Sequence, residues 1–311
     1  MRSNFLNLVL SGELCRTQCN STPEWLLVWK AEQKRFAPND PWLAAVSAAM
    51  QADRLAWAFF SGYQGAIQSA FPGHASVGHA GAFCVNESHR KISEITTTLS
   101  ANDGGLTLSG SKAWVLAELQ ELDLFVLAKK AGGPEAGPGS MSVVHLSIDS
   151  PGVSRGDVRP QPMVPEVPHS SIAFNAVRLK PEQVIDGDGY TDFAKPFRLR
   201  EDLFVTSCVL AYLISEGRSG KWSTEWIQRC ISVMSMLRQC TELDPNEAKT
   251  HILVAGDLSF SGEVIRESEE LWTPHQKDER NRWHRDKQIL ELGKDARRQR
   301  AMTSWETVGW N

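Results

Sequence analysis

Hydrophobic and polar positions divide the chain into three regions. From Thr22 to Phe71 apolar side chains recur every three to four positions, which is typical of amphipathic helices. From His74 to about Val184 the period changes to two, as in half-buried strands. Beyond residue 190 the helical period returns. We therefore expect an N-terminal helical region (1–74), a central β domain (75–186) and a C-terminal helical bundle (187–311).

Capping residues mark where the helices begin and end. Thr22-Pro23-Glu24 combines an N-cap residue, a proline in the first turn and an acid near the positive helix end. Asn39-Asp40-Pro41 starts the next helix in the same way, and Phe71-Pro72-Gly73 ends it. Within that helix Gly62 and Gly65 either permit close packing or weaken it locally. Further helices are expected at about 24–35, 192–217, 224–241, 246–271 and 275–305.

The segment from Phe83 to Lys129 reads as a series of strands separated by turns. Leu106 and Leu108 are two positions apart, as are Trp114 and Leu116, which is the apolar spacing of half-buried antiparallel strands. Just before Leu106, the segment from Asn102 to Gly105 supplies the glycines that a tight hairpin turn requires. Short strands spaced in this way predict a small antiparallel barrel or sandwich. The expected fold class is α+β, with this β domain between the helical regions.

Composition and charge restrict the classes of partner. The chain has 311 residues and a net charge of −4, which gives no reason to expect a nucleic-acid partner. The segment Arg280 to Arg300 is rich in basic residues, but acids are interspersed at helical spacing. Such mixing usually marks a solvated helix face. An alternative is that this helix binds acidic partners or a phosphate-bearing ligand.

The six cysteines and the short N-terminal apolar run bear on location. No pair of CxxC motifs is present, so we expect no metal site, and free thiols in a reducing compartment are the better interpretation. The run from Asn4 to Leu10 is too short to span a membrane. Asp186-Gly187-Asp188-Gly189 lacks the ligand spacing of a calcium loop and reads as a turn. These features predict a cytoplasmic protein with no membrane span.

An ordered set of motifs resembles the acyl-CoA dehydrogenase family. Phe83 to Glu87 is similar to the family strand that ends in a Thr-Glu-Pro motif. The segment from Asp103 to Val115 is similar to the family's acid-Gly, strand, Asn-Gly-x-Lys and Trp-Ile-Thr sequence. The family's next strand, its Pro-Gly-Val turn and its later Phe-x-x-Val segment follow in the same order. The resemblance extends over roughly residues 40 to 220, and beyond them it rests on architecture.

This resemblance implies FAD chemistry on an acyl thioester, with CoA as the expected carrier. In the family, a carboxylate removes the acidic α-proton while the flavin accepts hydride from the β-carbon. Trp114 matches the tryptophan that faces the flavin, and the resemblance assigns cofactor contacts to Asn86, Ser88, Trp114 and Val115. The alternative role of Trp114 is that of a core aromatic of the β domain. Family members also imply an electron-transfer partner and a homo-oligomer assembled through the C-terminal bundle.

Glu201 is the candidate for the catalytic base. The chain has no Tyr-Glu-Gly segment late in its sequence, where many family members carry the base. A subset uses a Glu-Arg pair on the first C-terminal helix, and Glu201 matches that Glu, although Asp202 replaces the Arg. Two adjacent acids near a helix start also interact favourably with the helix dipole, which is a purely structural alternative.

Two departures from the family pattern keep a second function open. Leu116 replaces the threonine whose hydroxyl meets the flavin, and Glu87 to Ser93 contains no glycine where the family has one. The first hypothesis is a flavin-dependent oxidoreductase acting on CH–CH bonds of an acyl thioester. The alternative is a flavin-poor or inactive scaffold of the same fold that acts as a binding or partner subunit. His169, which follows a rigid proline-containing loop, either reaches a ligand or caps a turn.

Overall fold

The computed structural model describes residues 2–12, 14–36, 39–88, 91–102, 104–133, 139–159 and 161–310. The chain forms two compact units. One unit, here the helical unit, comprises residues 1–69, 162–164 and 199–311. The other, here the sheet unit, comprises residues 70–161 and 165–198.

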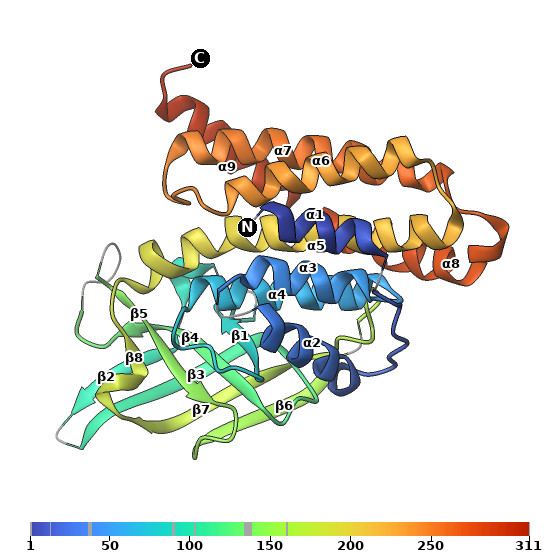
Figure 1. Ribbon diagram of the computed structural model, residues 1–311. Helices are drawn as coiled ribbons and strands as arrows, with labels where there is room; N and C mark the ends of the chain where they lie inside the picture. Colours follow the sequence, from blue (N-terminus) through green and yellow to red (C-terminus); the bar gives the residue numbers. More distant parts are fainter. Residues whose placement is uncertain are drawn as a thin grey trace. The chain divides into compact units, whose positions relative to one another are not determined.

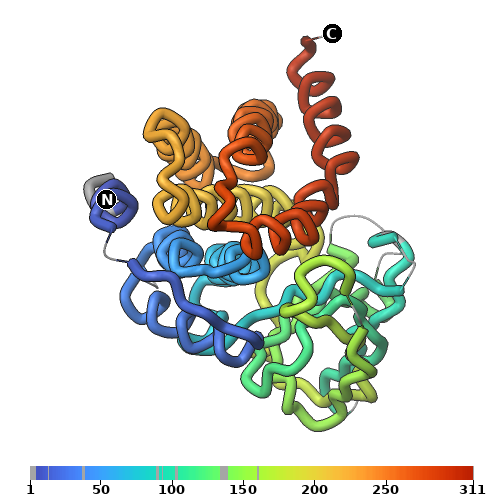
Figure 2. The backbone as a smooth tube through the Cα atoms, turned by 90° about the vertical axis from the view of Figure 1, so that its right-hand side faces the viewer, coloured from blue at the N-terminus to red at the C-terminus, as the bar shows by residue number. Residues whose placement is uncertain are grey.

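The helical unit contains most of the α-helical residues (Figure 1). Its helices α6 and α7 run side by side (Figures 1 and 2). The first four residues of α5 and the last residue of α4 belong to the sheet unit. The helices are α1 (Arg2–Ser11), α2 (Thr22–Phe36), α3 (Pro41–Met50), α4 (Leu55–Ala70), α5 (Lys195–Gly220), α6 (Thr224–Cys240), α7 (Ala248–Glu267), α8 (Lys277–Asp286) and α9 (Lys294–Thr307).

The start of α3 and the close packing of α4 follow the sequence pattern, whereas Thr22, the predicted N-cap of α2, is the first residue of that helix. The Asp40 carboxylate accepts a hydrogen bond from the Leu43 N–H, so Asp40 is the predicted N-cap of α3. A Cβ at Gly62 would lie 2.6 Å from the Cα of Val205. This glycine therefore lets α4 approach the backbone of α5, which decides between the two interpretations of its role.

Two predicted helices are interrupted, and one helix was not predicted. The helix expected from residue 41 to residue 71 is broken between α3 and α4, where Thr17 forms a parallel bridge with Ala52. The helix expected over residues 275–305 is divided into two: α8 ends at Asp286, and Gly293, with a left-handed φ of 77°, directly precedes α9. Helix α1 forms in a segment with only a short apolar patch as signal.

The sheet unit holds one eight-stranded sheet in the order β6-β7-β3-β2-β4-β5-β8, with β1 also paired to β4. The β1–β4 and β2–β4 pairs are parallel and the others antiparallel. The prediction of an α+β fold with a central β domain is confirmed. The sheet is mixed rather than antiparallel, and the described strands do not close into a barrel. The strands are β1 (Ala80–Cys84), β2 (Thr98–Asn102), β3 (Gly105–Leu116), β4 (Leu122–Lys130), β5 (Met141–Ser147), β6 (Val153–Arg159), β7 (His169–Leu179) and β8 (Val184–Ile185).

Strand β4 is the centre of the sheet unit. It pairs with three other strands, and its residues from Leu122 to Ala128 are all buried. The Phe125 ring of β4 stacks on Phe71 with centroids 4.0 Å apart. At the opposite extreme, β6 is an edge strand whose residues are almost all exposed. Within the described ranges, no helix combines the length and apolar character that crossing a bilayer requires.

Candidate functional site

A buried ion pair joins the segment that follows β1 (residues 85–88) to β3. Glu87 is 6% exposed and Lys112 is 1% exposed. The Lys112 ammonium donates to a Glu87 carboxylate oxygen at 3.1 Å and to the Val85 carbonyl at 3.2 Å. The N–H and hydroxyl groups of both Thr96 and Thr97 donate to the same carboxylate at 2.6–2.9 Å. Every lone-pair direction of a buried anion is thereby used.

The pKa of Glu87 reflects these contacts. Burial alone would raise this pKa, but the hydrogen bonds from Thr97 and Thr96 and the charge of Lys112 outweigh it and lower the pKa to about 2. Burial lowers the pKa of Lys112, and the Glu87 carboxylate opposes that change. Both groups are therefore held charged by each other, and the pair anchors the segment that precedes the candidate site.

Trp114 stands out from the regular strand around it. Its backbone is left-handed, with a φ of 60°, and its side chain is 54% exposed. A register shift between β3 and β7 lies between Lys112 and Val115. A bulge of this kind changes which face the following side chains occupy. Trp114 is consequently exposed whereas Leu116 is 5% exposed, which differs from the simple alternation expected from sequence.

The backbone at Trp114 is held by neighbouring segments. The Ala113 N–H donates to the Asn86 carbonyl at 2.9 Å, which places the end of the β1 segment beside the bulge. A bulky residue in the left-handed region costs of order 1–3 kcal/mol and persists where the surroundings enforce it. Such strain is typical of functional sites. The guanidinium of Arg159, on the edge strand β6, lies 5.7 Å from the Trp114 ring centroid.

Polar atoms without partners lie on the strand next to this bulge. On β7, His169 pairs in register with Leu116, and Ser170 pairs with Val115. The His169 Nδ1 and Ser170 Oγ atoms are buried and have no hydrogen-bond partner among the described residues. Burial also lowers the pKa of His169, which favours its neutral form, while a hydrogen bond to the Val167 backbone opposes this shift. Unpaired buried polar atoms are rare and call for an explanation.

The sheet unit brings together the four residues assigned to cofactor binding. Asn86 and Ser88 are exposed, and Asn86 is bonded through its carbonyl to the residue before Trp114. Val115 is 2% exposed and pairs in register with Ser170 of β7, so it is buried beside Trp114. Sequence reasoning missed Lys112 as a buried charge and Arg159 as the neighbour of Trp114. The signal for Lys112 was its even spacing from the buried Leu108, four residues earlier. This spacing places both side chains on the same face of β3.

Glu201 lies in the first turns of α5, in the helical unit, and is half-buried. Its neighbour Asp202 forms ion pairs with two arginines of α9, Arg297 at 3.1 Å and Arg300. These arginines neutralise the acid that replaces the family's Arg. Part of the basic character of the last helix is thus used inside the unit rather than presented to solvent.

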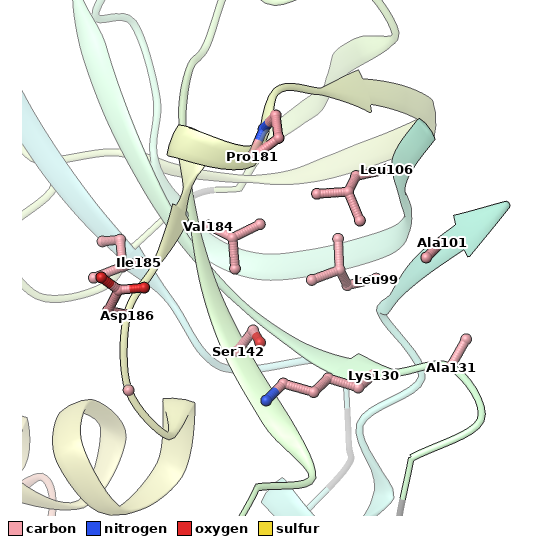
Figure 3. A pocket seen from close by; sticks show the side chains of 11 residues that line it. Leu99, Ala101, Leu106, Lys130, Ala131, Ser142, Pro181, Val184, Ile185 and Asp186 are labelled. Atoms are coloured by element: carbon pink, nitrogen blue, oxygen red, sulfur yellow. The ribbon is translucent and has the colours of Figure 1, made fainter. Parts of the chain in front are cut away.

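A hollow lies elsewhere in the sheet unit. It measures about 430 Å³ and is open to solvent. Leu99 and Leu106 from β2 and β3 point toward Val184 of β8, and Lys130 and Asp186 border the same hollow (Figure 3). None of the residues assigned to catalysis or cofactor binding lines it. Among the described residues, no group of three or more His, Cys, Asp or Glu side chains is arranged to hold a metal ion.

Comparisons with known proteins identify the fold. No protein-family model matches the sequence, and no curated protein matches it significantly. A crystal structure of an FAD-dependent dehydrogenase is similar with a TM-score of 0.70 and 13% identity, over 100% of this chain and 98% of the other. Butyryl-CoA dehydrogenase from Megasphaera elsdenii is similar with a TM-score of 0.67 and 12% identity, over 97% of each chain.

FMN-bound TdsC from Paenibacillus sp. A11-2 is similar to the same degree. Its TM-score is 0.67 at 13% identity, over 98% of this chain and 94% of the other. Identities this low establish architecture rather than activity. The similarity nevertheless extends over both units and over nearly the full length of each of these solved structures. The chain therefore has an acyl-CoA dehydrogenase-like fold.

Proposed function

We propose that the protein is a flavin-dependent oxidoreductase that acts on the CH–CH bond of an acyl thioester, with FAD as cofactor and CoA as the carrier. The observation that carries the proposal is Trp114, an exposed indole on a strained left-handed bulge. Large exposed aromatic rings held in one orientation are suited to stacking against a planar ligand. Solved structures of the same fold include proteins described as FAD-dependent or FMN-bound.

The residues around Trp114 fit a flavin in chemical type. Asn86 and Ser88 offer exposed polar side chains, and Val115 follows Trp114 on β3. Leu116 is buried and cannot donate a hydrogen bond. His169, which pairs with Leu116 in register, has an unpartnered buried nitrogen and supplies the polar atom that Leu116 lacks. We infer that Asn86, Ser88, Trp114 and Val115 hold the cofactor, with His169 beside them.

Glu201 would act as the base. Bound FAD would supply the acceptor for the hydride that leaves the β-carbon. The Glu201 carboxylate would take the proton from the α-carbon, which the thioester carbonyl acidifies. Because Arg297 and Arg300 neutralise Asp202, the adjacent acid does not place an unneutralised negative charge beside the base.

Exposed apolar side chains support self-association through the C-terminal helices. Leu253 and Phe260, seven positions apart on α7, are 50% and 54% exposed. On α9, Trp305 is 40% exposed. We infer a homo-oligomer built on this face, and an electron-transfer partner that reoxidises the cofactor. The cysteines form no disulfide, which agrees with a reducing, cytoplasmic location.

Flavin uptake tests the proposal directly. We expect the purified protein to show flavin absorption bands, or to acquire them when FAD or FMN is added. Trp114→Ala should weaken binding by about tenfold or more, because stacking on an aromatic ring is lost. Trp310→Ala, which removes an indole that is 75% exposed in the helical unit, is the matched control. A colourless protein that takes up neither flavin supports the alternative function, a flavin-poor scaffold acting as a binding or partner subunit.

A second experiment tests Glu201 separately from flavin binding. Glu201→Gln should keep flavin uptake and slow the anaerobic reduction of bound flavin by acyl-CoA roughly 10²–10⁴-fold, the usual contribution of a general base. Glu263→Gln, which changes an exposed acid on α7, is the control. Reduction at the wild-type rate in Glu201→Gln would assign the base to another residue.

A further inference from the structure

The helical unit contains a hollow of about 250 Å³ that is lined only by polar side chains. Sites for drug-sized ligands usually begin near 300 Å³ and are mainly apolar. This hollow is therefore suited to a small polar ligand. Its lining residues come from the segment after α1, the segment before α4, and α8; they are Arg16, Gln18, Asp53, Glu279 and Arg282.

The charges around the hollow leave one guanidinium poorly satisfied. Arg54 donates hydrogen bonds of 3.0 and 2.7 Å to the Asp53 carboxylate, so the negative charge of Asp53 repels an anion in the hollow only weakly. Arg282 donates to the Asp53 carbonyl at 3.3 Å, and its Nε atom is buried without a partner among the described residues. A buried donor without an acceptor is costly. The Arg282 side chain as a whole is 28% exposed, so the accessible part of its guanidinium is available to a ligand oxygen.

Glu279 is the only other acid lining the hollow, and it is held loosely. Its Oε1 atom lies 3.7 Å from an Arg16 nitrogen and 3.9 Å from an Arg282 nitrogen. Both distances exceed that of a hydrogen bond. The two guanidinium groups thus face one carboxylate that neither binds closely. A ligand oxyanion placed between them would compete with Glu279 on favourable terms, because arginine matches carboxylate and oxyanion geometry with paired donors.

Arg16 also connects the hollow to a buried acid. Its Nη2 atom lies 2.7 Å from an oxygen of Glu216, whose side chain is fully buried on α5. The Gln276 amide donates to the other Glu216 oxygen at 3.2 Å. Burial raises the pKa of Glu216 to about 7, with Glu279 adding to the rise and Arg16, Gln276 and Tyr212 opposing it. Among the described residues, Arg16, Glu279 and Tyr212 are thus the charged and titratable groups that act on Glu216, and Gln276 is a neutral donor.

We propose that this hollow binds a small oxyanion, held by Arg16, Gln18 and Arg282, and that binding is coupled to uptake of a proton by Glu216. When Glu216 is protonated, Arg16 loses its charged partner and its donors turn to the ligand. An anion on Arg16 in turn favours the protonated acid, so the linkage is reciprocal. Binding is accordingly tighter below pH 7 than above it. The shared chemistry includes tetrahedral and planar oxyanions, and the site is independent of the proposed flavin chemistry.

Calorimetric titration with sodium sulfate tests the site, since sulfate keeps the same charge from pH 6 to pH 8. Sodium chloride should hold the ionic strength constant, and parallel titrations with acetate and phosphate separate planar from tetrahedral ligands. We expect saturable sulfate binding that is tighter at pH 6 than at pH 8. Arg282→Gln should weaken it at least about tenfold through loss of charge-assisted hydrogen bonds. Arg298→Gln, an exposed position on α9, should leave it unchanged.

Glu216→Gln tests the proton coupling, because glutamine reproduces the protonated acid. This variant should bind sulfate at pH 8 as the wild type does at pH 6. Circular dichroism checks that each variant is folded, and Arg16→Gln provides a second removal of a guanidinium if Arg282→Gln unfolds. Absence of saturable binding by the wild type at pH 6, or wild-type affinity in both arginine variants, would overturn the site. Full pH dependence in Glu216→Gln would overturn the coupling.

Discussion

The buried Glu87–Lys112 pair makes the strongest stability prediction. Removing one partner leaves an uncompensated charge among side chains that are 6% and 1% exposed. Breaking such a pair typically costs about 3–5 kcal/mol. The pKa of Glu87 gives an independent figure, because lowering it from 4.5 to about 2 corresponds to about 3 kcal/mol of stability at neutral pH. Lys112→Met and Glu87→Gln should each destabilise the sheet unit by about 3 kcal/mol.

The pH dependence has a definite sign. Because the pKa of Glu87 is lower in the folded state, its contribution is fully present above pH 4.5 and is lost as the pH falls toward 2. The difference in stability between the wild type and Glu87→Gln should therefore shrink across this window. The double variant Glu87→Gln/Lys112→Met should cost clearly less than the sum of the single changes, because it leaves no unpaired charge.

Hydrogen exchange with mass spectrometry measures these values where they arise. Peptides that cover β1 and β3 report the free energy of opening of the sheet unit, separately from the helices. Lys130→Met, which changes an exposed lysine on β4, is the matched control and should have little effect. Costs below about 1 kcal/mol for both single variants, or additive costs in the double variant, would refute the reasoning.

Two further predictions concern backbone approach and the last helix. Gly110→Ala should destabilise the sheet unit by about 2 kcal/mol or more, because a Cβ there would lie 2.6 Å from the Thr97 Cα and the φ of this residue is 138°. Urea unfolding measures the change in stability, and a neutral effect would contradict the prediction. Asp202→Asn should remove the ion pairs to Arg297 and Arg300, at a cost of about 1 kcal/mol in stability. It should also speed limited proteolysis within α9. Unchanged cleavage would show that these ion pairs do not hold the helix in place.

Helix positions were predictable because their signals are local. An N-cap such as Asp40 bonds within its own first turn, so its role can be recognised without knowing the fold. Gly62 and Gly65 indicated that another segment could pack closely against this helix. They did not indicate which segment, since Val205 is more than a hundred residues away in the sequence. Interruptions were harder to predict: the break between α3 and α4 coincides with a bridge to Thr17.

The candidate site was only partly accessible from the sequence. The ordered motifs around Asn86 and Trp114 identified the segment, and the fold comparison agrees with the architecture that they implied. The assignment of Glu201 as base and of the cofactor contacts stays a prediction. Neither Arg159 nor the unpartnered His169 nitrogen could be placed beside Trp114 by local pattern, because strand pairing between β6, β7 and β3 creates that neighbourhood.

The sequence by itself determined the succession of helical, β and helical regions, because periods of 3.6 and 2 record which side of each element is buried. Only the tertiary structure decided which charges are buried and which aromatic ring is exposed. Lys112 is buried because the Glu87 carboxylate, which Thr96 and Thr97 also hydrogen-bond, pairs with it from a distant segment. Trp114 is exposed because a bulge against β7 interrupts the alternation. Both outcomes depend on contacts between segments that are distant in the sequence, so neither can be deduced from the residues of one segment alone.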